Sequence, residues 1–201
     1  MYLGIDLGTS SVKAVVVDDE GLVQDEASVP LHVQRPGVGM SEQSPNDWWV
    51  AVEDAVSQLE GWSRGVRAIG LSGQMHGAVL TNKDGKPLRN AILWNDVRAD
   101  KECAELEERV DVRGITGNAA MAGFTAPKLA WVRSNEPENF AATAKVLLPK
   151  DFVRFCMTGV FASEMSDASG TLWLDVNNRC WSEEMLEATG MTLSHMPELF
   201  E

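Results

Sequence analysis

The fold of this chain is decided by one stretch near its start, YLGIDLGTSSVKAVVVD at residues 2–18. Two apolar runs, 2–7 and 12–17, flank a short polar turn within it. Runs of this length on either side of a glycine-containing turn predict a hairpin of two antiparallel strands. Gly8 has no side chain, so the backbone of the turn can come close to a ligand.

The polar groups of this hairpin suit a phosphate group. The turn N–H groups and the hydroxyls of Thr9, Ser10 and Ser11 can donate to phosphate oxygens, and Lys13 lies close by. Asp6 can hold Mg²⁺, mostly through water, because Mg²⁺ keeps much of its hydration. The alternative is an ordinary hairpin, since Gly and Ser are common in turns. A strand follows the glycine turn, which argues against a Walker loop and a Rossmann fingerprint.

Composition narrows the class of protein. The 201 residues allow one large domain or two small ones, and 44% hydrophobic with 23% charged residues is ordinary for a globular protein. A formal net charge of −13 argues against a nucleic-acid partner. No apolar run approaches the length of a membrane helix, and no signal core opens the chain. Cys103, Cys156 and Cys180 lie far apart and have no metal-ligand spacing, so we expect a cytoplasmic protein.

Periodicity along the chain predicts an α/β domain with a mixed sheet. Strands are expected at 2–7, 12–17 and 22–29, a helix at 46–61 with Asn46 as a candidate N-cap, and a buried strand at 67–72. This gives the order β-β-β-α-β. Further along, we expect short strands at 78–81 and 87–93, an apolar run at 146–148, and helices at 98–110, 127–135, 149–157 and 182–189.

The first candidate site beyond the hairpin is Gln74-Met75-His76-Gly77, which follows the buried strand at its carboxyl end. Ligands of open α/β sheets bind at that edge. His76 can hydrogen-bond a sugar hydroxyl or carbonyl. The alternative is a loop histidine satisfied by the protein itself.

Two more segments are candidates. In Trp94-Asn95-Asp96, Trp94 offers a flat apolar wall for the C–H face of a sugar, and Asn95 and Asp96 offer polar contacts. Alternatively, Trp94 belongs to the core and Asp96 caps the next helix. The glycine-containing approach from Gly123 to residue 129 can bring backbone close to a substrate.

Two neighbouring segments favour structural roles. We interpret Pro127 and Lys128 as helix-initiating residues. The polar segment 166–171 can be a turn or a wall of a cleft, and we interpret it as a structural turn.

Taken together, these motifs resemble the amino-terminal domain of the FGGY family of sugar kinases, part of the actin-like ATPase superfamily. Met75-His76 is the specific feature, because members that act on xylulose carry Met-His where those that act on glycerol carry Arg-Glu. Ser134 departs from the larger polar residue usual in the family's signature helix. The matching segments are 2–13, 48–49, 73–77, 91–96, 117–118, 123–131, 147–151 and 165–167.

The resemblance implies an RNase H-like fold and use of ATP with Mg²⁺. Asp6 would lie beside the metal and the transferred phosphoryl group. The Gly8 turn with Thr9, Ser10 and Ser11 would contact the ATP phosphates, and Lys13 would help to neutralise them. On the sugar side, the contacts would come from Met75, His76, Trp94, Asn95 and Gly123.

The resemblance also implies the reaction, phosphorylation of D-xylulose to D-xylulose 5-phosphate. Ribulose, gluconate and glycerol remain alternative sugars, and a sugar-binding domain without turnover remains an alternative function. Family members are much longer than 1–201, so we expect this chain to be the amino-terminal domain, incomplete at its C-terminal end. The family's base aspartate, in a Gly-Asp segment, and the adenosine-binding lobe are expected outside it. We expect no nucleic-acid or membrane partner, and a homodimer stays open.

Overall fold

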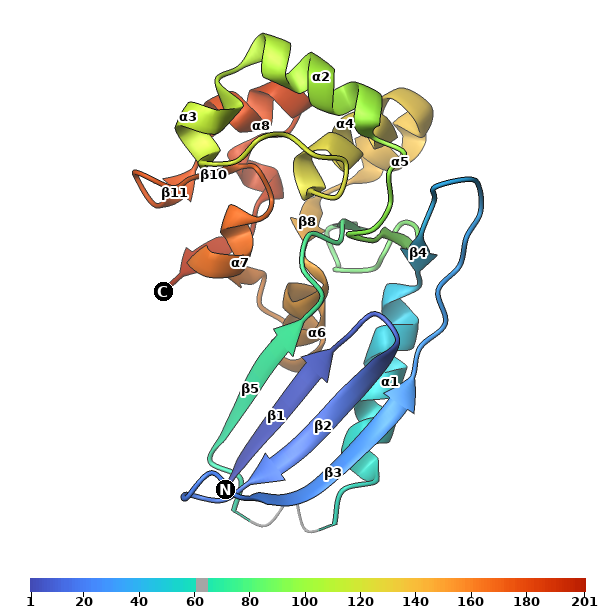
Figure 1. The fold of residues 1–201 in the computed structure, drawn as a ribbon, viewed down its shortest axis with the longest axis vertical. Coiled ribbons are helices and arrows are strands. Elements are labelled where there is room, and N and C mark those ends of the chain that lie inside the picture. Colours follow the sequence, from blue (N-terminus) through green and yellow to red (C-terminus); the bar gives the residue numbers. More distant parts are fainter. Residues whose placement is uncertain (61–64) are drawn as a thin grey trace.

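The computed structural model describes residues 1–60 and 65–201. The lower part in Figure 1 is a sheet of order β3-β2-β1-β5, and the upper part is mostly helical. The strands of this sheet are β1 (Tyr2–Leu7), β2 (Ser11–Val17), β3 (Val23–Pro30) and β5 (Ala68–Gly73). Strands β1, β2 and β3 pair antiparallel, and β5 pairs parallel to β1. The predicted mixed sheet and β-β-β-α-β order are therefore confirmed.

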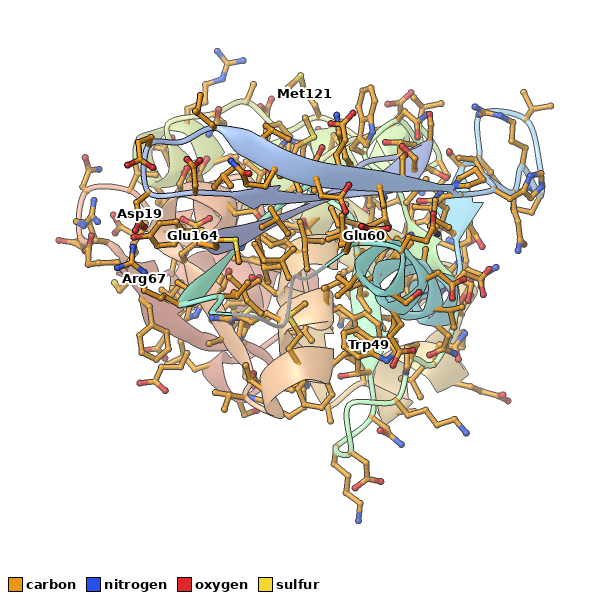
Figure 2. The ribbon with its side chains drawn as sticks, turned by 90° about the horizontal axis from the view of Figure 1, so that it is seen from below. Asp19, Trp49, Glu60, Arg67, Met121 and Glu164 are labelled. Atoms are coloured by element: carbon orange, nitrogen blue, oxygen red, sulfur yellow. The ribbon has the colours of Figure 1, made fainter. Side chains whose placement is uncertain are left out.

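The hairpin forms because its side chains alternate between two environments. Leu3, Ile5 and Leu7 of β1 are buried on one face, where they belong to the same core as Val12 and Val16 of β2. Helix α1 (Pro45–Ser57) covers this face, as the view from below shows (Figure 2). The alternation leaves every second residue of β1, such as Asp6, on the opposite face.

Two details of α1 differ from prediction. Its N-cap is Ser44, whose side chain accepts from the N–H of Asp47, and Asn46 is already inside the helix. Pro45 before Asn46 takes the first helical position, where its missing N–H costs nothing. The helix ends at Ser57, before the predicted end at residue 61, which lies outside the described residues.

A second core holds the helical part together. It includes Leu106, Leu129, Val132, Trp173 and Leu186, all nearly fully buried. The helices of this part are α2 (Asp100–Arg109), α3 (Val112–Thr116), α4 (Thr125–Asn135), α5 (Pro137–Ala142) and α8 (Glu183–Thr189). Helices α2, α4 and α8 correspond to predicted helices, whereas α3 and α5 were not predicted.

Several short elements connect the two cores. The predicted helix at 149–157 is confirmed as α6 (Pro149–Thr158). Of the predicted strand at 87–93, only Ala91–Ile92 forms a strand, β7. The paired short strands are β4 (Glu42–Gln43) with β7 (Ala91–Ile92), β6 (Val79–Thr81) with β8 (Lys145–Leu147), β9 (Ala162–Glu164) with β12 (Glu198–Phe200), and β10 (Leu174–Asp175) with β11 (Cys180–Trp181). Helix α7 (Met165–Ser169) and the 3₁₀ turn η1 (Leu193–His195) complete the set.

Ion pairs tie the lower edge of the sheet. Arg67 pairs with Asp19, beside which it lies in Figure 2, and its guanidinium stacks 4.9 Å from the centroid of the Tyr2 ring. Within the described part of the chain, no helix is both long and apolar enough to cross a membrane.

Candidate active site

The β1–β2 turn needs a glycine. The Gly8 N–H donates to the carbonyl of Ser11 at 3.0 Å, and a Cβ on Gly8 would lie 3.0 Å from the same oxygen. Ser10 is exposed at the tip, and its carbonyl accepts from the N–H of Leu31. The tip therefore keeps the Ser10 hydroxyl open to solvent on a turn that is fixed at its base.

Thr9 is bound to three other segments. Its hydroxyl donates to Gln74 Oε1 at 3.1 Å and accepts from Trp94 Nε1 at 3.0 Å, and its carbonyl accepts from Gln43 Nε2 at 2.8 Å. The single hydroxyl hydrogen of Thr9 is thus already used. The expected phosphate contacts of this turn fall to its backbone N–H groups and to Ser10 and Ser11.

Asp6 and Lys13 lie opposite each other on the uncovered face of the sheet. They are register partners, and Asp6 is also paired across the β1–β5 ladder with Ser72. Lys13 forms an ion pair with Glu26 at 2.8 Å, and since both side chains are more than half exposed the pair contributes little stability. Asp6 has no ion-pair partner among the described residues.

The donor set here fits Mg²⁺ in one particular way. No group of three His, Cys, Asp or Glu side chains within the described ranges is arranged to hold a metal ion. A metal at the hairpin would therefore rest on the Asp6 carboxylate, water and phosphate oxygens. Mg²⁺ in phosphate sites typically has one or two protein carboxylates and keeps several waters.

A buried glutamine joins the hairpin to the loop after β5. The N–H of Gln74 donates to the carbonyl of Leu7 at 2.7 Å, and its side chain donates to Gln43 Oε1 at 2.9 Å. Gln43 in turn accepts from the indole N–H of Trp48 at 3.0 Å. The sequence analysis did not single out Gln43, because its partners are distant in sequence. Gln74 is detectable only as a polar residue that directly follows a predicted strand. The prediction that this strand is buried is wrong, because β5 lies at the edge of the sheet and all of its residues are exposed or only partly buried.

His76 has an unusual backbone conformation. Its φ is 63°, which lies in the left-handed region that few residues other than glycine adopt. Its carbonyl accepts from Lys128 Nζ at 2.8 Å and from Thr125 Oγ1 at 3.1 Å. Its ring lies 4.5 Å from that of Phe124, centroid to centroid. Such strained positions are concentrated at functional sites.

The His76 ring presents an acceptor. Nδ1 lies 2.7 Å from the carbonyl oxygen of Gly170 and must carry the proton, because a carbonyl only accepts. Burial lowers the pKa of His76, opposed by the Gly170 contact and reinforced by Lys128, so the ring is neutral at pH 7. Nε2 of this tautomer is an acceptor, which suits a sugar hydroxyl better than a sugar carbonyl.

A cavity of about 540 Å³ lies beside His76. Its walls come from the end of β5, the loop after it, and helix α7. The residues that line it include Ser72, Gly73, Met75, His76, Asn118, Phe124, Lys150, Glu164, Ser166, Asp167, Ser169 and Gly170. Asp6, Trp94, Asn95 and Gly123 do not line this cavity, although Asp6 is the register neighbour of Ser72.

Trp94 and Met75 are both exposed apolar side chains. Trp94 is 42% exposed and Met75 45%, so Trp94 does not belong to the core. Gly123 packs against the Trp94 backbone, where an added Cβ would lie 2.5 Å from the Trp94 carbonyl oxygen. Asn95 has a buried Oδ1 with no hydrogen-bond partner among the described residues.

The predicted role of Asp96 as a helix cap is wrong. It neither faces solvent nor caps α2, which begins at Asp100 after Ala99. Its carboxylate is buried, accepts from the N–H of Ser41 at 2.6 Å, and pairs with Arg98 at 2.7 Å. A carboxylate this deep is retained only when it is paired and hydrogen-bonded.

The interpretation of 166–171 as only a structural turn is also incomplete. The segment forms α7 and the following loop, and four of its residues line the cavity. Burial raises the pKa of Asp167 to about 6, against the attraction of Lys150 at 3.4 Å. The sequence assigns no individual site role to Lys150, Glu164 or Asp167, because their charges meet only through the fold.

Replacing Gly170 with alanine should disturb the ring of His76 directly. An added Cβ would lie 2.6 Å from both Cε1 and Nδ1 of His76, so the ring must leave its place. We expect a loss of about 1–3 kcal/mol in the free energy of unfolding, measured by urea denaturation. Gly70→Ala is the matched control, because a Cβ at Gly70 meets nothing within 4 Å. Equal stability of the two variants would contradict the placement of His76.

Lys128 should make stability depend on pH. Burial lowers its pKa to about 7, opposed by Asp96 and reinforced by Arg98, while an unfolded lysine titrates near 10.4. Between these values the unfolded chain binds the extra proton, so the free energy of unfolding rises with pH. Relative to Lys128→Met, the wild type should gain about 1 kcal/mol per pH unit from pH 7.5 to 9.5.

Denaturation at several pH values measures this slope. Lys101→Met, at a position whose side chain is 83% exposed, controls for the loss of a lysine in general. Parallel pH profiles for wild type and Lys128→Met would show that Lys128 does not titrate in this window.

Comparisons with known proteins agree on one family. Residues 1–201 match the model of the N-terminal domain of the FGGY family of carbohydrate kinases. The chain is 51% identical over 204 residues to a xylulose kinase of Klebsiella pneumoniae, covering 100% of this chain and 42% of that protein. It thus spans less than half the length of the curated relatives it matches.

Solved structures agree as well. A xyloylose kinase from Brucella ovis superposes with a TM-score of 0.97 at 48% identity, covering 100% of this chain and 42% of that chain. A xylulose kinase from Rhodospirillum rubrum superposes with a TM-score of 0.95 at 26% identity, covering 99% of this chain and 42% of that chain.

Proposed function

Because the chain belongs to the FGGY family of carbohydrate kinases, as its N-terminal domain, we propose that it supplies the sugar site and the first phosphate-binding turn of an enzyme that phosphorylates D-xylulose with ATP. The product is D-xylulose 5-phosphate. D-Xylulose is favoured over ribulose, gluconate and glycerol because relatives at high identity are named xylulose kinases.

One observation carries the proposal: the turn and the His76 loop are held by a single hydrogen-bond network. Gln74 binds both the Leu7 carbonyl and Thr9, and His76 follows two residues later. A phosphate donor at the turn and a hydroxyl at His76 Nε2 would therefore meet at a fixed separation. Fixing two reactants in this way is a large part of catalysis by kinases.

In the reaction, the O–H bond of the sugar's C5 hydroxyl breaks and a bond from that oxygen to the γ-phosphorus of ATP forms. The bond from the γ-phosphorus to the bridging oxygen breaks, and ADP leaves. The turn at Gly8, with Ser10 and Ser11, binds phosphate oxygens, and Lys13 offsets their charge. Mg²⁺, held by Asp6 largely through water, supplies further neutralisation when bound.

The sugar side of the site orients its ligand. The neutral Nε2 of His76 accepts from one hydroxyl, and the exposed apolar surfaces of Met75 and Trp94 offer contact to C–H groups. Asn95 and Gly123 lie next to Trp94 and complete this side. We assign binding and orientation to this chain, and removal of the hydroxyl proton to a group outside it.

Calorimetric titration of this chain tests the sugar assignment. D-Xylulose should bind, while D-ribulose, gluconate and glycerol should bind more weakly or not at all. Binding of gluconate or glycerol without D-xylulose would overturn the substrate. ADP release by the full-length enzyme then tests turnover, and the same assay on this chain tests whether it acts only as a sugar-binding domain.

A further inference from the structure

Lys128 is placed where a lysine is least expected. It lies in the first turn of α4, where the helix dipole disfavours a positive charge, and its side chain is fully buried. Buried lysines normally pair with a carboxylate. Within the described residues Lys128 has no such ion pair, and its Nζ donates to two backbone carbonyls, of His76 at 2.8 Å and of Gly123 at 2.7 Å.

Both carbonyls belong to segments of the proposed sugar site. The first carbonyl belongs to His76 itself, whose φ is 63°. This backbone conformation costs about 1–3 kcal/mol and persists only when the surrounding structure holds it in place. Lys128 and Thr125 hold that carbonyl, and Gly170 holds the ring of the same residue. His76 is thus fixed at its backbone and at its side chain by different elements.

The second carbonyl brings in Trp94. Gly123 lies so close to the Trp94 carbonyl oxygen that no Cβ would fit between them. The hydrogen bond from Lys128 Nζ to the Gly123 carbonyl therefore also restrains the backbone of Trp94, which packs against Gly123. The Nζ of Lys128 thus bonds the loop of His76 and the segment of Gly123 directly, and through Gly123 it also restrains the backbone of Trp94.

We propose that Lys128 is a positioning residue of the sugar site, which holds His76 in its left-handed conformation and Gly123 against Trp94. This role goes beyond the helix initiation that the sequence predicts for Lys128. Its effect on sugar affinity rests on the proposed function, whereas its effect on the conformation of His76 does not.

The chain offers a matched control. Lys145 also donates to two backbone carbonyls, those of Ser194 and Met196, both at 2.8 Å, and none of these residues lines the cavity. Lys128→Met and Lys145→Met thus each remove two hydrogen bonds from a lysine to backbone carbonyls, one pair beside the cavity and one pair away from it. Two measurements compare them in this chain: D-xylulose affinity by calorimetry, and the backbone coupling constant and chemical shifts of His76 by NMR.

We expect Lys128→Met to weaken D-xylulose binding about 10-fold or more and to lose the positive-φ signature of His76, because the substitution leaves two backbone carbonyls without their buried donor and a loss of this kind has this size. Lys145→Met should retain both. A retained His76 signature in Lys128→Met would overturn the proposal whatever the sugar result. Absence of D-xylulose binding in the wild type would overturn the proposed function instead, and the NMR comparison would still decide the role of Lys128.

A second variant guards against misfolding. Lys128→Gln keeps a donor, but its shorter side chain can reach at most one of the two carbonyls. We expect it to fold and to show a partial loss of both signals. Wild-type sugar affinity together with an unchanged His76 signature in this variant would also overturn the proposal.

Discussion

Replacing His76 with alanine in the full-length enzyme should lower kcat/KM for D-xylulose by about 10- to 100-fold, because one oriented hydrogen bond and its positioning are lost. The KM for ATP should change little, since the turn proposed to bind phosphate contacts Gln74 and not the His76 ring. Steady-state kinetics with each substrate varied in turn measure both quantities.

A second substitution separates the ring from the backbone. Asparagine adopts the left-handed region more readily than most residues, so His76→Asn should keep the loop while removing the imidazole. His195→Ala, which removes a histidine from the 3₁₀ turn η1, is the control. Normal D-xylulose kinetics in both His76 variants would remove His76 from the sugar site.

Replacing Asp6 with asparagine should lower turnover by at least about 100-fold while leaving D-xylulose affinity nearly unchanged, because electrostatic groups aimed at developing charge act mainly in the transition state. The change preserves shape, and Asp6 lies on the uncovered face of the sheet without an ion-pair partner among the described residues, so stability should be almost unaffected. Phosphoryl transfer and calorimetric sugar binding are measured on the same preparations.

Asp54→Asn, at an exposed position on α1, controls for the loss of one negative charge. Added Mg²⁺ should restore part of the activity of Asp6→Asn if the carboxylate serves to hold the metal. Full activity of Asp6→Asn at low Mg²⁺ would eliminate that role.

The elements that the sequence predicts well have their own periodicity. The alternation of Leu3, Ile5 and Leu7 marks β1, and the helical spacing of Trp49, Val52 and Ala55 marks α1. Strands such as β4 and β9 have only two and three residues, too few for any period. They exist because backbone groups distant in sequence pair with each other, which no local pattern records.

The same limit applies to the site. The residues of the hairpin and of the loop after β5 were found because they follow strands directly. From the sequence, Lys128 is interpreted as a helix-initiating residue and a helix cap is one of two interpretations of Asp96, because both residues lie close to the start of a predicted helix. Their partners, His76 for one and Ser41 for the other, are distant in sequence and come close only in the folded chain.

In the proposed function, the hydrogen bonds of Thr9 connect the sugar site with the phosphate-binding turn. Its hydroxyl bonds Gln74, which lies two residues before His76, and the indole of Trp94, while its backbone lies in the turn proposed to bind phosphate. A ligand that orders the residues of one site also orders, through Thr9, some residues of the other site. The second ligand then loses less conformational entropy when it binds. By thermodynamic linkage, ATP should then strengthen D-xylulose binding by the same factor as D-xylulose strengthens ATP binding, and Thr9→Val should reduce both factors together.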